Sequence, residues 1–137
     1  MIRSAGGHTV ARVISADRTQ DLGRRGEELA AEHLSRLGYR ILARNHRTRW
    51  GELDLVLTDE REATIVFCEV KSRRLGSGPP FDSLHERKQR QVRKMAAAWL
   101  AVVTDRPFGA ELRFDAVGVT LDDRGSLVRL DHLQAAF

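Results

Sequence analysis

The segment TIVFCEVKSRR, residues 64–74, constrains the fold more than any other part of the chain. It opens with consecutive apolar residues, as strands buried on both faces do, and closes with a carboxylate and an ammonium group. Residues two apart in a strand point to the same face, so Phe67, Glu69 and Lys71 share one side. The segment therefore predicts a central strand that carries two charged groups on one face near its end.

The segment GELDLVLT, residues 51–58, comes just before this strand, and the polar turn DEREA separates the two. Together they predict a β-hairpin. The alternating leucines of the first strand are expected to point to one face and Asp54 to the other. If the strands pair through their aliphatic faces, Asp54 reaches the face of Glu69 and Lys71.

The other elements follow from apolar periodicity. The predicted elements are a helix over 21–37 ended by Gly38, strands over 39–45, 51–58 and 64–72, a helix opened by a capping box from Ser83 to Glu86, a strand over 113–121 and a short edge strand over 126–130. The expected inward stripe of the second helix is Leu84, Lys88, Val92, Met95, Ala96, Trp99, Leu100 and Val103. This order, αβββαβ with an extra edge strand, predicts an α/β fold with a mixed central sheet flanked by helices.

Length and composition predict one intracellular domain. A chain of 137 residues can bury a single core. We expect the domain over residues 19–137, after a flexible tail over residues 1–18. The single cysteine excludes an intrachain disulfide, and no Cys/His spacing fits a structural zinc site. Without a secretory signal or a run of about 20 apolar residues, the protein is expected to be cytoplasmic and free of the membrane.

Carboxylates on neighbouring strands predict a site for a hard divalent cation. Mg²⁺ and Mn²⁺ prefer oxygen ligands, commonly one or two carboxylates with water and substrate phosphate oxygens. Asp54 and Glu69 fit this role, and the backbone carbonyl of Val70 is a candidate third ligand. The first helix offers a further carboxylate from Glu27 or Glu28. We favour Glu27 because it borders the apolar stripe of that helix.

Lys71 is expected to act as a cation beside the reacting phosphate. Two nearby carboxylates favour its protonated form. A bound metal ion acidifies its own water directly, so we assign deprotonation of the attacking water mainly to the metal. Lys71 would orient the resulting hydroxide and stabilise the negative charge of the transition state.

Basic residues form two blocks along the chain. Residues 36–50 contain five arginines and no acid, and residues 71–94 contain eight Lys or Arg against two acids. Such blocks fit either a solvated surface or a face that binds a polyanion by releasing its counterions. On the second interpretation the expected nucleic-acid contacts are Arg47, Arg49, Arg73, Arg74, Lys88, Arg90, Arg93 and Lys94. Trp50 could stack on an unpaired base or pack internally, and Lys88 could reach a phosphate or extend to solvent.

The order of motifs resembles the YraN family of small bacterial proteins. The similar segments, which cover residues from about 21 to 121, are GRRGEELAAEHLSRLGYRILARN, GELDLV, FCEVKSR, the helix from Lys88 to Leu100, and RFDAV. Asp54 followed by Glu69-Val70-Lys71 also resembles the PD-(D/E)xK signature of the restriction-endonuclease-like superfamily, with Leu53 in place of the proline. The resemblance implies a restriction-endonuclease-like core related to Holliday-junction resolvases. It implies the catalytic residues Glu27, Asp54, Glu69 and Lys71. Asp115, in RFDAV, matches a family position and fits an ion pair as well as catalysis.

These inferences favour a metal-dependent endonuclease that hydrolyses DNA phosphodiester bonds with Mg²⁺ or Mn²⁺. By analogy with the resolvases, the expected partner is branched or single-stranded DNA in repair or recombination. The alternative is a nucleic-acid-binding module of the same fold without independent catalytic activity, and a protein-binding scaffold is a third hypothesis. Two symmetric cuts across a junction would require a homodimer.

Overall fold

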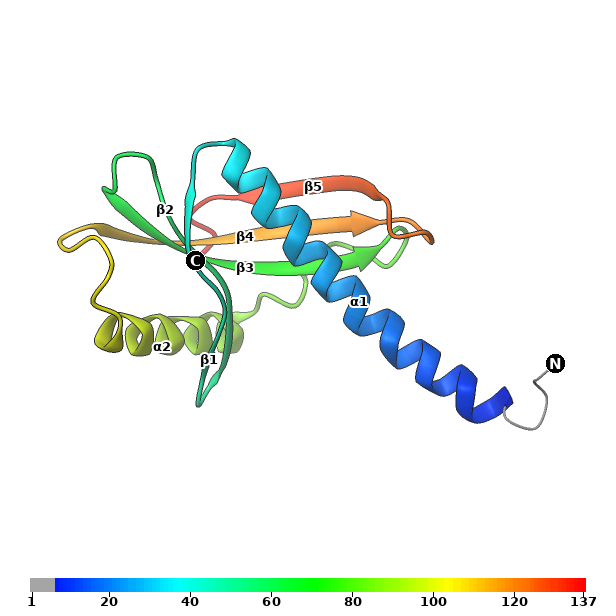
Figure 1. The fold of residues 1–137 in the computed structure, drawn as a ribbon. Coiled ribbons are helices and arrows are strands. Elements are labelled where there is room, and N and C mark those ends of the chain that lie inside the picture. The colour runs from blue at the N-terminus through cyan, green and yellow to red at the C-terminus, as the bar shows by residue number, and fades with distance from the viewer. Residues whose placement is uncertain (1–6) are drawn as a thin grey trace.

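The computed structural model describes residues 7–137, with side chains from residue 21 onward. The elements are α1 Gly7–Arg36, β1 Arg40–Thr48, β2 Gly51–Thr58, β3 Thr64–Arg74, α2 Glu86–Val102, β4 Glu111–Leu121 and β5 Leu127–Leu133 (Figure 1). This order confirms the predicted α/β fold, including the extra edge strand. The arrangement is consistent with a restriction-endonuclease-like core.

The five strands form one mixed sheet in the order β1-β2-β3-β4-β5. Only β3 and β4 pair in parallel, and a parallel pair needs a crossover connection, which α2 supplies. The α1-side core contains Ala30, Ala31, Leu34, Leu55, Leu57, Val66, Cys68, Val70, Val117, Val119 and Leu121. The α2-side core contains Leu53, Val56, Ile65, Phe67, Val92, Met95, Ala96, Trp99 and Phe114. Each helix thus covers one face, as Figure 1 shows.

Helix α1 ends where the sequence predicts but begins earlier. Gly38 has φ +100°. The N–H of Tyr39 donates to Leu34 O and that of Gly38 to Ser35 O, both at 3.1 Å, which is a Schellman motif. Leu37, the last residue of the predicted helix, is 57% exposed because the chain already turns there. The helix begins at Gly7, not at Asp21.

The tail predicted over residues 1–18 overlaps this helix. Residues 1–6 lie outside the described residues, and residues 7–20 are described as helical backbone alone. The flexibility predicted for the tail therefore stays untested. Within the described part of the chain, neither helix has the length and apolarity needed to cross a bilayer.

Helix α2 begins later than its predicted capping box. His85 is the N-cap, and its Nδ1 accepts the N–H of Lys88 at 3.3 Å, so the prediction of Ser83 as the cap is wrong. An imidazole nitrogen serves here as the acceptor that a serine hydroxyl usually provides. The predicted inward stripe is confirmed at Val92, Met95, Ala96 and Trp99, which are buried, whereas Leu84 precedes the helix.

The pairing of β2 with β3 stops halfway along β2. The ladder runs from Thr58 opposite Ile65 to Leu55 opposite Cys68. Beyond that point β2 remains paired with β1 as far as Gly51, whereas β3 continues beside β4 to Arg74. The β1–β2 hairpin therefore leaves the sheet and turns toward α2 (Figure 1).

This fork changes the face of one leucine. Leu53, Leu55 and Leu57 were expected to share a face, but Leu53 packs in the α2-side core and the other two in the α1-side core. The prediction for Leu53 is wrong because strict alternation assumes a straight strand, and β2 bends away from β3 between Leu53 and Leu55.

The close contact between α1 and β3 can be tested at two glycines. A Cβ at Gly26 would lie 1.7 Å from Ser72 Oγ and 2.9 Å from Ser72 Cβ, whereas a Cβ at Gly23 would meet no described side chain within 4 Å. We expect Gly26→Ala to lower the free energy of unfolding by about 1–3 kcal/mol through overpacking. Gly23→Ala, the matched control, should raise it by up to about 1 kcal/mol through helix propensity. Urea unfolding measures both, and equal stability of the two variants would contradict the packing.

Candidate active site

Asp54 lies at the fork between β2 and β3. Where the two strands separate, the N–H of Val70 loses the carbonyl partner that a continued ladder would supply. Asp54 Oδ2 accepts this N–H at 2.7 Å. A side chain of the departing strand thus completes the hydrogen bonding of β3, and this bond fixes the carboxylate next to Glu69.

Three carboxylates gather at this fork. Glu27 of α1 and Glu52 and Asp54 of β2 each offer an oxygen within 4.8 Å of the other two. Glu28, the competing residue, is exposed and lies 4.0 Å from Arg25 instead. The structure therefore brings Glu27 rather than Glu28 to Asp54, as the sequence predicted. It adds Glu52, which sequence reasoning missed although Glu52 lies two residues before Asp54 and so shares its face by strand alternation.

Asn45 holds two of these carboxylates together. Its Nδ2 donates to Glu27 Oε1 at 2.8 Å and to Glu52 Oε1 at 3.0 Å. Asn45 has φ +49°, a left-handed conformation that asparagine adopts more readily than most residues. Sequence reasoning missed this residue too. The available signal was an asparagine inside a strand pattern, where it is normally depleted.

Glu69 is a buried carboxylate held by two lysines. It is 4% exposed, and its Oε2 lies 3.2 Å from Lys71 Nζ and 3.2 Å from Lys88 Nζ. A buried carboxylate is tolerated when such pairing compensates its desolvation. Lys88 comes from the first turn of α2, so its inward position brings its amine to the site rather than to solvent. Glu69 and Lys71 thus lie together as predicted, with Lys88 as a second ammonium group.

The surroundings of Asp54 raise its pKa to about 8 from the ordinary 3.8. Burial is the largest cause, and the negative charge of Glu69 is the next. The hydrogen bond from Val70 opposes the shift, and the charge of Glu27 adds to it. Near neutral pH this carboxyl therefore tends to keep its proton. A divalent cation bound among these oxygens would compete with that proton for the same site.

The predicted nucleic-acid contacts lie in varied surroundings. Arg47 is 86% exposed at its side chain and lies 3.7 Å from Glu52, and Arg49 lies over the ring of Trp50. Arg93 instead stacks on Phe114, 4.5 Å from its ring centroid. The remaining ones differ as follows: Arg90 pairs with Glu86 at 3.8 Å, Lys94 is exposed, Arg74 lines a hollow, and Arg73 Nε is buried without a hydrogen-bond partner among the described residues.

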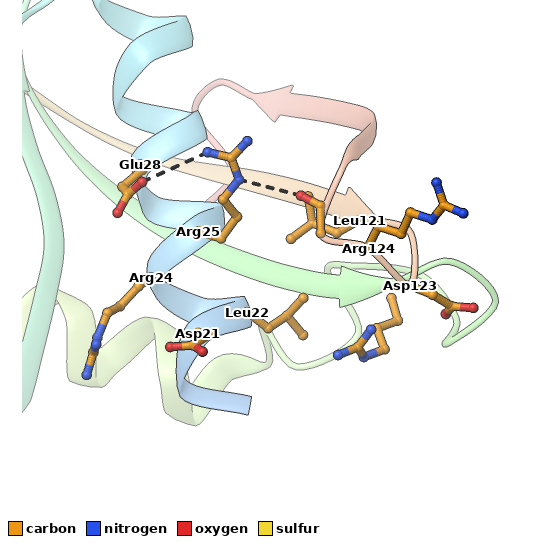
Figure 2. Close-up of a pocket in the computed structure, with 10 residues that line it drawn as sticks. Asp21, Leu22, Arg24, Arg25, Glu28, Leu121, Asp123 and Arg124 are labelled. Carbon is orange, nitrogen blue, oxygen red and sulfur yellow. Dashed lines mark hydrogen bonds and ion pairs between the residues drawn. The ribbon is translucent and has the colours of Figure 1, made fainter. Parts of the chain in front are cut away.

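A hollow of about 860 Å³ lies between α1 and the far end of the sheet (Figure 2). Its lining residues are Asp21, Leu22, Arg24, Arg25, Glu28, Arg74, Leu121, Asp123, Arg124 and Gly125. Figure 2 shows the guanidinium of Arg24 pointing away from the others, while Arg25 donates to Gly125 O at 3.5 Å. Because acids and arginines are mixed and the charges do not converge, the hollow indicates no ligand class.

Asp115 forms a separate buried network on the α1 side. It is 0% exposed. Its carboxylate accepts from Arg113 Nε and Nη2 at 2.8 Å each and from the Ala135 N–H at 3.0 Å, and it lies 2.8 Å from His132 Nε2. Burial would raise the pKa of Asp115, but the bonds from His132 and Arg113 hold it below the usual value. Of the two interpretations of Asp115, the structure shows the ion pair.

The fold and site define a small α/β protein with an acidic cluster at a sheet fork, and comparison with known proteins places it in a family. The profile of the uncharacterised protein family UPF0102 matches residues 26–119. The chain therefore belongs to the UPF0102 family. The matched region contains Glu27, Asp54, Glu69 and Lys71.

Related proteins match over nearly their full length. A UPF0102 protein of Parafrankia sp. (strain EAN1pec) is 46% identical over 122 residues, which cover 87% of this chain and 98% of that protein. A UPF0102 protein of Frankia alni is 48% identical over a region that covers 85% of this chain and 93% of that protein. A UPF0102 protein of Geobacter metallireducens is 43% identical over a region that covers 86% of this chain and 93% of that protein.

The raised pKa of Asp54 predicts a pH dependence of stability. Between pH 3.8 and about pH 8, Asp54 keeps its proton in the folded protein but has lost it in the unfolded chain, because its pKa is raised on folding. The free energy of unfolding should therefore fall as the pH rises through this window, by at most about 1.4 kcal/mol per pH unit from this group. Asp54→Asn keeps an acceptor for Val70 and removes the titration. We expect it to gain stability relative to wild type steadily from pH 5 to 8.

Urea unfolding in EDTA at several pH values measures this difference. Glu28→Gln, which neutralises an exposed neighbour of the cluster, is the matched control and should follow the wild-type curve. A constant offset between Asp54→Asn and wild type across the window would contradict the environment described for Asp54.

Proposed function

We propose that this protein is a metal-dependent nuclease that hydrolyses phosphodiester bonds of DNA. The observation that supports the proposal most is the convergence of Glu27, Asp54 and Glu69 with the ammonium group of Lys71 at one fork of the sheet. Asp54, Glu69 and Lys71 resemble the aspartate and the ExK pair of the PD-(D/E)xK signature, and α1 adds Glu27 to them. We propose on this basis that the protein is a member of that superfamily and a relative of Holliday-junction resolvases.

The residues at the fork fit Mg²⁺ or Mn²⁺. Carboxylate oxygens are the ligands that hard cations prefer, and Asp54, Glu69 and Glu27 would hold the ion, with the carbonyl of Val70 as a further oxygen. When bound, such an ion acidifies water and neutralises phosphate charge. Both lysines contact Oε2 of Glu69.

The chain's own cations would act on the phosphate. Lys71 and Lys88 place two positive charges within 3.2 Å of one carboxylate oxygen. Charges fixed in place before the reaction stabilise negative charge that develops on a phosphoryl oxygen. Lys71 would also orient the attacking water, as expected from the sequence. Lys88, for which the sequence left both a phosphate contact and extension to solvent open, would join Lys71 in this role.

Branched or single-stranded DNA is the proposed substrate, in repair or recombination. The predicted contacts on the hairpin tip and on α2 flank the acidic cluster, and cations beside a phosphodiester site hold the DNA backbone. Symmetric cuts across a junction would require two copies, so we include a homodimer in the proposal.

One observation favours a second function, a DNA-binding module without catalysis. Two ammonium groups already compensate Glu69, and Asp54 tends to carry a proton near neutral pH. The site is therefore electrostatically satisfied without a cation. The same assay separates the two functions, because a module would bind DNA and leave it uncut.

Cleavage of labelled four-way junctions, flaps and linear duplex in Mn²⁺ tests the proposal. We expect Asp54→Asn, Glu69→Gln and Lys71→Met each to lower the rate by at least about 100-fold, because each removes a ligand or a charge needed in the transition state. Glu27→Gln should lower the rate, and its neighbour Glu28→Gln is the matched control that should not.

Two results would overturn the nuclease function. If the wild-type protein binds these substrates and never cuts them, only the second function, a DNA-binding module without catalysis, would remain. Cutting that persists unchanged in Asp54→Asn and Glu69→Gln would show that the fork is not the catalytic site. Anisotropy binding in EDTA, run on the same variants, verifies that each one still recognises DNA.

A further inference from the structure

The tip of the β1–β2 hairpin carries an exposed aromatic residue beside the proposed site. Trp50 is 37% exposed, whereas the second tryptophan, Trp99, is 1% exposed in the α2-side core. Arg49 lies over the Trp50 ring with its guanidinium carbon 4.6 Å from the centroid. An exposed indole with an arginine stacked on it is the combination that binds the flat face of a nucleic-acid base.

The turn that carries Trp50 is held rigidly. Thr48 Oγ1 accepts the N–H of Trp50 at 3.1 Å and donates to Gly51 O at 2.9 Å. Gln91 of α2 donates to the carbonyl of Trp50. Gly51 has φ +135°, and a Cβ there would lie 2.8 Å from the Gln91 amide nitrogen, so the turn packs directly on α2. A rigid aromatic residue loses little entropy on stacking.

The charges around this tip suit an anionic partner. Arg47, at the end of β1, has an 86% exposed side chain. On α2, Arg87, Lys88 and Lys94 lie three or four residues from Gln91, so they share its side of the helix. Of these, Lys88 contacts Glu69 directly. Basic side chains therefore lie both on the hairpin tip and on the part of α2 that holds it, and one of them, Lys88, reaches the acidic cluster.

We propose that the hairpin tip is a stacking platform for an unpaired DNA base, with Trp50 as the stacking residue and Arg49 as its cationic partner. The inference rests on the proposed function for the identity of the ligand as DNA. Asp54 lies four residues after Trp50 in the chain, a span of about 13 Å along a strand. This corresponds to about four base-pair steps, so the platform would select DNA that is unpaired within about four nucleotides of the scissile phosphate.

The intrinsic fluorescence of the two tryptophans tests this platform directly. Titration of the full-length protein with single-stranded oligonucleotide, in EDTA to prevent cutting, should quench the emission of Trp50. Trp50→Phe leaves the buried Trp99 as the only emitter, and that emission should stay unchanged at saturation. Unaltered Trp99 emission also verifies that the variant is folded.

Affinity measured by anisotropy gives the second readout. Trp50→Ala should weaken binding to single-stranded and flap DNA by about 5- to 150-fold, the range of one lost stacking contact, and binding to blunt duplex by less than about twofold. Trp50→Phe should retain most of the affinity because it keeps an aromatic face. Phe108→Ala is the matched control, since Phe108 is 70% exposed and has Arg106 4.3 Å above its ring in a loop of another region.

The results separate this inference from the nuclease proposal. Quenching and selective loss of affinity in a protein that never cuts DNA would support the platform and overturn the nuclease. Cutting at the fork without any response of Trp50 at saturating oligonucleotide would overturn the platform alone. Equal loss of affinity for single-stranded and duplex DNA in Trp50→Ala, or no binding of oligonucleotide at all, would also overturn it.

Discussion

The architecture of this protein depends on the separation of β2 from β3 after the Leu55–Cys68 pair. A strand that leaves a sheet strips its neighbour of hydrogen-bond partners, and each buried group left unpaired costs about 1–3 kcal/mol. Asp54 replaces the lost hydrogen-bond partner of the Val70 N–H with a carboxylate oxygen, which lies 2.7 Å from the Val70 nitrogen. Because the acceptor belongs to the departing strand, the same hydrogen bond that stabilises the fork also positions a carboxylate beside Glu69. The structural requirement and the acidic site are therefore one feature.

Gathering carboxylates at one place requires that their mutual repulsion be reduced. This site uses three devices among the residues that the structure describes. The amide of Asn45 bridges Glu27 and Glu52, two ammonium groups contact Glu69, and a raised pKa lets Asp54 keep a proton. Ammonium groups and a proton can each yield to a doubly charged cation, whereas the backbone that holds the oxygens together stays in place. Under the proposed function, a divalent cation would therefore replace the proton and the ammonium groups without moving the backbone.

Much of the fold was predictable because residues buried on one face of a helix or strand recur at regular spacings in the sequence. The order of elements, the bounds of β2 and the inward stripe of α2 follow from apolar spacing alone. The failures occur where the chain departs from regular geometry. Leu53 changes face because β2 bends at the fork, and His85 replaces the predicted cap because an imidazole served as acceptor. Asn45 enters the site through a left-handed backbone that no alternation rule anticipates. Asp115 could be assigned to an ion pair only from the structure, in which both Arg113 and His132 contact its carboxylate.

The fork also explains how two helices that lie on opposite faces of the sheet both contribute residues to one site. A continuous ladder between β2 and β3 would separate Glu27, which comes from α1, from Lys88, which comes from α2. Separation of the strands opens the sheet at that level, so side chains from the two layers meet around Asp54 and Glu69. The crossover between parallel β3 and β4 then fixes where α2 starts, because a helix that follows the end of β3 must pack back over the face of that strand. Its first turn consequently carries Lys88 to Glu69, and its next turn receives the hairpin tip through Gln91. A bend in a single strand thus sets the relative positions of the acidic cluster, the ammonium groups and the exposed tryptophan.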